Sequence, residues 1–168
     1  MTVVSRSLGT VLPVALVERL SQRDIARRLG VALPFVTVDE AGRPHPMLLS
    51  YLEVRAYSPG TLGLVIQARS GTARNLAARG VGTLLIVEPD AVIYVKTRVV
   101  DGPLDVTDDD FGLGYFLLAV EDVVEDAAAE WEGGLGITSA VEYRPVPALD
   151  APWVRATLAA LAAPRARV

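Results

Sequence analysis

The feature that most constrains the fold is a succession of short β-forming segments, separated by turn residues, across residues 33–145. The segments are rich in Val, Ile, Leu and Thr, and glycine or proline stands in the connections between them. Such a pattern predicts antiparallel strands joined by hairpins. The predicted strands cover residues 33–39, 44–57, 61–68, 81–88, 91–100, 115–126 and 137–145.

Helices are predicted only around this series. Residues 13–30 have helical spacing of apolar residues, and Ser21 followed by Asp24 resembles a capping box, which leaves one bent helix or two helices open. A short helix is predicted over residues 71–79, ended by Gly80, and a C-terminal helix over about 151–163. We therefore expect one mainly β domain over residues 1–168, an antiparallel barrel (about 33–145) with peripheral helices.

The strand predicted at residues 91–100 alternates as a barrel wall must. One face carries Ile93, Val95 and Val99, and the other carries Tyr94, Lys96 and Arg98. Because apolar and aromatic residues also occur on the outer face, we expect a second subunit to cover it in a homodimer.

Composition excludes several classes of function. A hydrophobic content of 51% and a formal charge of -4 argue against a disordered chain and against nucleic-acid binding. The chain has no cysteine, and its one histidine, His45, cannot form a multi-histidine metal site, so no metal centre is expected. We interpret His45 as a surface residue at the start of a strand. The apolar N-terminal stretch is too short to cross a membrane, so a cytoplasmic protein is expected.

The connection between the third predicted strand and the short helix contains the best candidate for a binding site. It brings Ser70, Gly71, Thr72, Arg74 and Asn75 to the start of a helix. The first turn of a helix has unpaired N–H groups and favours negative charge, and arginine adds a forked cationic donor. Two interpretations stay open: ordinary helix capping by Ser70 or Thr72, or a binding site for an anion.

The stretches "TVDEAGRPHPMLLSYLEV" and "SGTARNLAARGVGTLLIVE" resemble the pyridoxamine 5'-phosphate oxidase-like family of FMN-binding split barrels. The likeness covers residues 33–100. It implies an FMN cofactor at a homodimer interface. It also implies phosphate-binding roles for Ser70, Thr72 and Arg74 with Asn75 nearby, and backbone contacts to the flavin ring from Leu48, Leu49 and Ser50 and around Gln67.

Two departures from that family concern the phosphate and the substrate. Thr72 stands where many members have lysine, and residues 46–52 lack the basic residues that hold the vitamin B6 phosphate. We therefore do not expect a vitamin B6 phosphate as the substrate. Lys96 and Arg98 are candidates for the flavin or substrate side, or for surface or dimer contacts. Trp131 is expected to be a partly buried structural residue, the alternative being a cover for the flavin of a neighbouring subunit.

The resemblance implies an FMN-dependent oxidoreductase that acts on a small-molecule substrate or electron donor. A bound flavin carries the electron chemistry, so no acid–base side chain of the protein is strictly required. The alternatives are a flavin-binding or sensing protein without turnover and, in the same fold, a protein that binds haem or deazaflavin.

Overall fold

A computed structural model describes residues 5–89, 91–106, 110–133 and 136–167 of the chain. Its eight strands form one antiparallel sheet in the order β3-β2-β6-β7-β8-β5-β4, and β1 pairs with β8. The strands are β1 (Ser5–Gly9), β2 (Ala32–Val38), β3 (Pro44–Ser50), β4 (Val54–Ser58), β5 (Thr61–Gln67), β6 (Val81–Glu88), β7 (Ala91–Asp105) and β8 (Leu113–Ala127). The mainly β, antiparallel fold predicted from the sequence is confirmed.

The sheet curls because its two edge strands are consecutive in the chain. Residues 51–53 connect β3 directly to β4, which stand at opposite ends of the strand order. The ends of the two edge strands therefore converge at this corner. Side chains from all around the curved sheet fill its interior, among them Phe35, Ile86, Val95, Phe116 and Val123.

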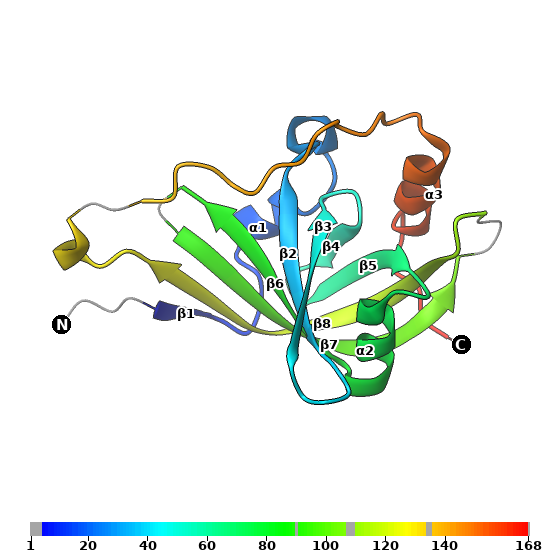
Figure 1. The fold of residues 1–168 in the computed structure, drawn as a ribbon, viewed down its shortest axis with the longest axis horizontal. Helices are drawn as coiled ribbons and strands as arrows, with labels where there is room; N and C mark the ends of the chain where they lie inside the picture. The colour runs from blue at the N-terminus through cyan, green and yellow to red at the C-terminus, as the bar shows by residue number, and fades with distance from the viewer. Residues whose placement is uncertain (1–4, 90, 107–109, 134–135, 168) are drawn as a thin grey trace.

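Short helices lie around the sheet, at both ends of the molecule in Figure 1. They are α1 (Val14–Arg19), the 3-10 helix η1 (Ile25–Arg28), α2 (Gly71–Arg79), the 3-10 helix η2 (Glu130–Glu132) and α3 (Pro152–Ala160). In Figure 1, α2 lies at the lower right and α3 at the upper right, and the segment before α3 crosses the top of the molecule. α3 buries Ala160 against Val65 and Tyr115 of the sheet, in a second apolar cluster.

The N-terminal region differs from the sequence prediction in two ways. A strand, β1, precedes the helices and pairs with β8, which the sequence analysis missed. The segment predicted as helix over residues 13–30 is divided into α1 and η1, because Gln22 adopts a left-handed φ of 66° between them. The predicted capping box does not form, since Ser21 Oγ donates a hydrogen bond to the carbonyl of Glu18.

The strand predicted over residues 44–57 is two strands, β3 and β4, separated by the corner. The loop predicted over residues 101–114 is largely wrong, because β7 continues to Asp105 and β8 begins at Leu113. Irregularities in the register near Asp101 let the ladder continue past the Gly102–Pro103 pair. Residues 107–109 of that predicted loop lie outside the described residues.

The seventh strand predicted over residues 137–145 is not formed. This segment makes one isolated bridge, Glu142 with Val31, and hydrogen bonds from Ala32 N to Val141 O and from Tyr143 N to Gly30 O. Pro145 ends this segment and Pro147 follows it, and proline lacks the N–H that a ladder requires. The barrel strands therefore end at Ala127, and the predicted C-terminal helix is confined to Pro152–Ala160.

The two faces of β7 alternate as predicted. Ile93 and Val95 are buried, whereas Lys96 and Arg98 are exposed. Lys96 Nζ lies 2.8 Å from Asp122 Oδ2 on β8. Arg98 Nε pairs in the same way with Glu121 of β8, at 2.9 Å from its Oε1.

Candidate functional site

The start of α2 combines a helix cap with free backbone donors. Ser70 is the N-cap residue, and its Oγ accepts a hydrogen bond of 3.1 Å from Ala73 N. The capping interpretation is therefore correct for Ser70. The hydroxyl proton of Ser70 and the N–H groups of Gly71 and Thr72 have no hydrogen-bond acceptor among the described residues. Capping by Ser70 does not use the N–H group of Gly71, so capping and anion binding are compatible at this helix.

A cavity of about 390 Å³, here called the α2 cavity, opens at this helix end. It is lined by Asp39, Glu40, Ala41, Arg43, His45, Gly71, Arg74 and Asn75. The Arg43 N–H groups, first the backbone and then the guanidinium, hold the pKa of Asp39 below its ordinary value. Asp39 thus balances the charge of Arg43, and Arg74 is the lining cation without a carboxylate partner among the described residues.

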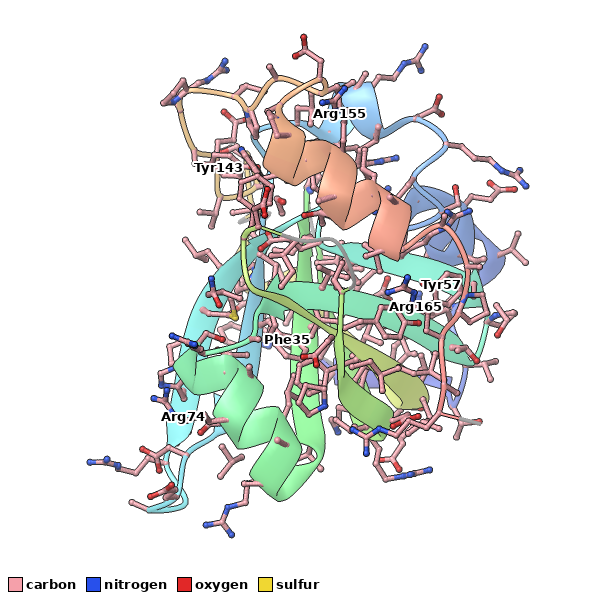
Figure 2. The ribbon with its side chains drawn as sticks, turned by 90° about the vertical axis from the view of Figure 1, so that its right-hand side faces the viewer. Phe35, Tyr57, Arg74, Tyr143, Arg155 and Arg165 are labelled. Carbon is pink, nitrogen blue, oxygen red and sulfur yellow. The ribbon has the colours of Figure 1, made fainter. Side chains whose placement is uncertain are left out.

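The guanidinium of Arg74 is anchored at one side only. Its Nη1 donates a hydrogen bond of 2.9 Å to the carbonyl of Arg69, while the rest of the side chain is exposed. Figure 2 shows Arg74 on α2, on the side of the molecule where the β2–β3 hairpin lies. The carbonyl of Arg69 therefore orients the guanidinium and leaves its other N–H donors free.

His45 of β3 contacts the same helix end. A Cβ atom added at Gly71 would lie 3.0 Å from His45 Nε2, so the imidazole packs closely on the glycine. As predicted, His45 lies at the start of a strand and is partly exposed, and its imidazole lines the α2 cavity between hairpin and helix.

Asn75 fixes α2 against the hairpin. Its Nδ2 donates a hydrogen bond of 3.0 Å to Thr37 Oγ1, and Thr37 Oγ1 in turn donates to the carbonyl of His45 at 3.3 Å. Asn75 and Thr37 are both buried, so these bonds are shielded from water. The chain of bonds sets the position of the helix end relative to His45.

A larger cavity of about 520 Å³, here called the β3–α3 cavity, lies at the other end of β3. It is lined by Leu48, Leu49, Ser50, Glu53, Tyr143, Pro145, Val146, Pro147 and Trp153. Three of these are the β3 residues predicted to contact a ring. Figure 2 shows Tyr143 in the segment that leads to α3, above the level of Arg74. Apolar and aromatic groups predominate, as in cavities that bind small molecules.

Glu53 is the one carboxylic acid among the described residues that line the β3–α3 cavity. Its Oε2 accepts hydrogen bonds from Ser50 N at 2.6 Å and from Ser50 Oγ at 2.9 Å. Burial raises the pKa of Glu53 above its ordinary value, although the two bonds from Ser50 oppose the shift. A carboxyl group held at a cavity wall with a raised pKa is a candidate for ligand binding or proton exchange.

Comparison with known proteins gives the fold. No protein-family model matches the chain, and no curated protein shows significant sequence similarity to it. A candidate pyridoxamine 5'-phosphate oxidase from Lactobacillus delbrueckii superposes with a TM-score of 0.53 at 14% identity, covering 70% of this chain and 98% of that one. An FMN-binding protein from Syntrophomonas wolfei superposes with a TM-score of 0.50 at 11% identity, covering 68% and 89%.

The chain is a split β-barrel of the pyridoxamine 5'-phosphate oxidase type. This confirms the fold that the sequence resemblance implied. Within the split barrel, the predicted residues Leu48, Leu49 and Ser50 line one cavity, and Arg74 and Asn75 line the other. Both cavities border β3, which carries His45 into the first and Leu48 into the second.

Four other predicted residues, Gln67, Ser70, Thr72 and Lys96, lie outside these two cavity linings. Thr72 is 2% exposed on the inner side of α2. Gln67 is tied to its own turn, because its Nε2 donates to the carbonyl of Phe111 and its Oε1 accepts from Arg69 N. Lys96 lines a separate groove over β2, β6 and β7. Their ligand-binding roles stay predictions.

Trp131 corrects another expectation. Its side chain is 78% exposed on η2, so it is not the partly buried structural residue that the sequence analysis favoured. η2 follows the end of β8 in the chain.

The sequence analysis missed Glu53 and His45 as cavity residues. For Glu53 a sequence signal existed, since Ser50 and Glu53 have the Ser-x-x-Glu spacing that lets a carboxylate reach back to a backbone N–H. For His45 there was none, because its neighbour Gly71 lies 26 positions later in the chain.

Within the described residues, no group of three or more His, Cys, Asp or Glu side chains is arranged to hold a metal ion. In the same part of the chain, no helix has both the length and the apolar character needed to cross a membrane.

Proposed function

We propose that the protein binds FMN, with the phosphate in the α2 cavity and the flavin ring at the β3–α3 cavity. The observation that carries this proposal is the start of α2. There, the N–H group of Gly71 and the remaining N–H donors of the Arg74 guanidinium belong to residues that line one cavity, where they can donate to an anion. Helix N-termini bind phosphate through these groups and through the helix dipole.

The spacing of the two cavities supports one ligand with two chemically different ends. His45 and Leu48 are three residues apart on β3, a distance of about 10 Å along a strand. The α2 cavity offers Arg74, whose charge has no carboxylate partner among the described residues, and the imidazole of His45, which suit a phosphate. The β3–α3 cavity is mainly apolar and aromatic, which suits a ring. A likeness in fold to an FMN-binding protein agrees with this assignment.

We further propose that the protein is an oxidoreductase. The bound flavin would supply the hydride or electron transfer, and the chain would supply position and exclusion of water. Leu48, Leu49 and Trp153 provide the apolar surroundings for a ring, and Arg74 holds the phosphate that fixes its register. No catalytic base from the chain is required for hydride transfer to a flavin.

A homodimer is the third part of the proposal. Leu48, at the border of the β3–α3 cavity, is 60% exposed, and β3 is an edge strand of the described sheet. An exposed apolar side chain beside a ligand cavity favours cover by a second copy. Light scattering at micromolar concentration should give twice the mass of 17.9 kDa, and a monomer that still binds flavin would contradict this part.

The decisive experiment compares FMN with riboflavin, which lacks the phosphate. Arg74→Ala should weaken FMN binding about ten- to a hundredfold, because a charge-assisted hydrogen bond contributes about 1.5–3 kcal/mol. Riboflavin affinity should scarcely change. Arg27→Ala is the control, since it removes an exposed arginine of η1 that lines neither cavity.

The affinities follow from quenching of flavin fluorescence in titrations of the wild type and both variants. If the wild type binds FMN and riboflavin equally well, the phosphate is not bound at α2 and the proposal fails. Turnover is tested separately, by following reduction of the bound flavin with candidate electron donors.

A further inference from the structure

Among the described residues, hydrogen bonds reach only one of the two carboxyl oxygens of Glu53. Both donors of Ser50, its N–H and its hydroxyl, bind Oε2. No described residue donates a hydrogen bond to Oε1, and Oε1 is not among the fully buried atoms without a partner. Since Glu53 lines the β3–α3 cavity, its free oxygen is open to a ligand there.

The surroundings of Glu53 restrict that ligand. Among the described residues that line the cavity there is no lysine, arginine or histidine, and Tyr143 is the one other titratable side chain. Gln22, which packs on the same corner from the α1–η1 connection, is neutral and donates to the carbonyls of Tyr51, Leu52 and Val54. An ionised Glu53 therefore repels anions and needs a donor from the ligand.

We propose that Glu53 Oε1 accepts a hydrogen bond from an N–H group of a planar, neutral or cationic ring bound in the β3–α3 cavity. The inference rests on the proposed function only where it identifies this ring as that of the flavin. It adds a side-chain contact that selects the ligand by charge. It also implies that phosphate and carboxylate groups are excluded from this end of the site.

Binding of such a ring is linked to a proton. An N–H donor stabilises the carboxylate and not the carboxylic acid, so the ligand lowers the pKa that burial has raised. At a pH near the pKa of the free protein, binding should release a fraction of a proton. At lower pH the affinity should fall, because the carboxyl group must first lose its proton.

Glu53→Gln is an informative variant because Ser50 decides how the amide is oriented. Two donors of Ser50 face one position, so the amide oxygen must occupy it, and the NH2 group replaces Oε1. The change keeps the size of the side chain and its bonds to the corner. It converts an acceptor that faces the cavity into a donor.

The probe is lumichrome, a tricyclic flavin ring with N–H groups and without the phosphate chain. Titration calorimetry in two buffers of different ionisation enthalpy gives both affinity and proton release. Glu53→Gln should weaken lumichrome binding about ten- to a hundredfold and abolish proton release. Glu132→Gln is the matched control, because Glu132 accepts the same kind of local bond, 2.6 Å from Ala129 N, and does not line the cavity.

A second variant tests whether Glu53→Gln weakens binding only by disturbing the structure. Ser50→Ala removes one donor that favours the carboxylate and leaves Oε1 facing the cavity. The pH at which lumichrome affinity declines should therefore move upward. Circular dichroism of each variant establishes that the barrel is intact.

The proposal is overturned if Glu53→Gln binds lumichrome as the wild type does, if binding exchanges no proton, or if the wild type does not bind lumichrome. Arg74→Ala should leave lumichrome binding unchanged, since this probe has no phosphate. The Arg74 variant therefore tests the phosphate site, and the Glu53 variant tests the contact to the ring, so the two proposals can fail independently.

Discussion

Replacing Gly71 by alanine should lower the affinity for FMN and leave the stability of the fold nearly unchanged. Gly71 is the first residue of α2, and it lies between the free N–H groups of the first turn and the imidazole of His45. A methyl group at this position would stand where a phosphate has to approach. The effect on binding should therefore exceed the effect on folding.

The magnitude follows from the contacts of the added Cβ. It would lie 3.0 Å from His45 Nε2 and 3.2 Å from His45 Cε1, a few tenths of an ångström closer than an ordinary contact. The half-buried imidazole borders a cavity and can shift by that amount. Alanine is favoured over glycine in helices by about 0.5–1 kcal/mol, which offsets the cost of the shift. Loss of one charge-assisted bond to the phosphate corresponds to about ten- to a hundredfold in FMN affinity.

Gly80→Ala, at the other end of α2, should affect stability and not FMN binding. Nothing lies within 4 Å of an added Cβ there, but the residue has a left-handed φ of 69°. Alanine in that conformation costs about 1–2 kcal/mol. This variant should lose stability and keep its ratio of FMN to riboflavin affinity.

Urea denaturation and flavin titrations on the wild type and both variants separate the two effects. The reasoning fails if Gly71→Ala binds FMN as tightly as the wild type. It fails equally if FMN and riboflavin affinities fall together in Gly71→Ala, because that result would indicate distortion of the whole site and not a blocked phosphate.

Two further predictions concern stability. Burial raises the folded-state pKa of Glu53 above 4.5, so its contribution to stability is complete below pH 4.5 and is lost as the pH rises through the folded-state pKa. The free energy of unfolding of Glu53→Gln, relative to that of the wild type, should thus increase between pH 4 and pH 7 in urea denaturation, by about 1.4 kcal/mol per unit of pKa shift. A difference between the two proteins that does not change with pH would contradict this. Gly82→Ala should destabilise the barrel by about 1–3 kcal/mol in the same assay, since its Cβ would lie 2.4 Å from Cζ of the buried Phe35, and an unchanged midpoint would show that the core can yield.

Local patterns were enough to predict much of the barrel. The helix over residues 71–79, with its stop at Gly80, is reproduced as α2 with a left-handed C-cap. Alternation along residues 91–100 correctly assigned the inner and outer faces of β7. These features depend on the spacing of apolar residues and on glycine chemistry, which are visible in a short window.

Features that depend on distant partners could not be predicted. β1 is a strand because β8 provides a ladder for it, with Ser5 opposite Asp126. The corner at residues 51–53 interrupts an apolar stretch without a glycine or proline to mark it. The segment 137–145 has strand-like composition, yet it finds only one bridging partner, Val31. Tertiary contacts override local propensity in each case.

Five of the predicted site residues line the two cavities, and their ligand-binding roles stay predictions. Ser70 and Arg74 were identified because helix-start chemistry is local. The cavity at α2, however, also requires the hairpin residues Arg43 and His45, which only the folded chain brings to the helix. Glu53 escaped notice because a strand was expected there, and on a strand its side chain would not return to Ser50.

Three features of the two cavities are unfavourable for the chain by itself. The N–H groups of Gly71 and Thr72 lack protein acceptors, Glu53 carries a raised pKa, and Leu48 exposes apolar surface. Each is relieved by a different part of the proposed complex: the phosphate satisfies the donors, a ring N–H satisfies Glu53, and a second subunit covers Leu48. Because folding alone would favour their removal, a sequence that retains all three near β3 is better explained by binding than by stability.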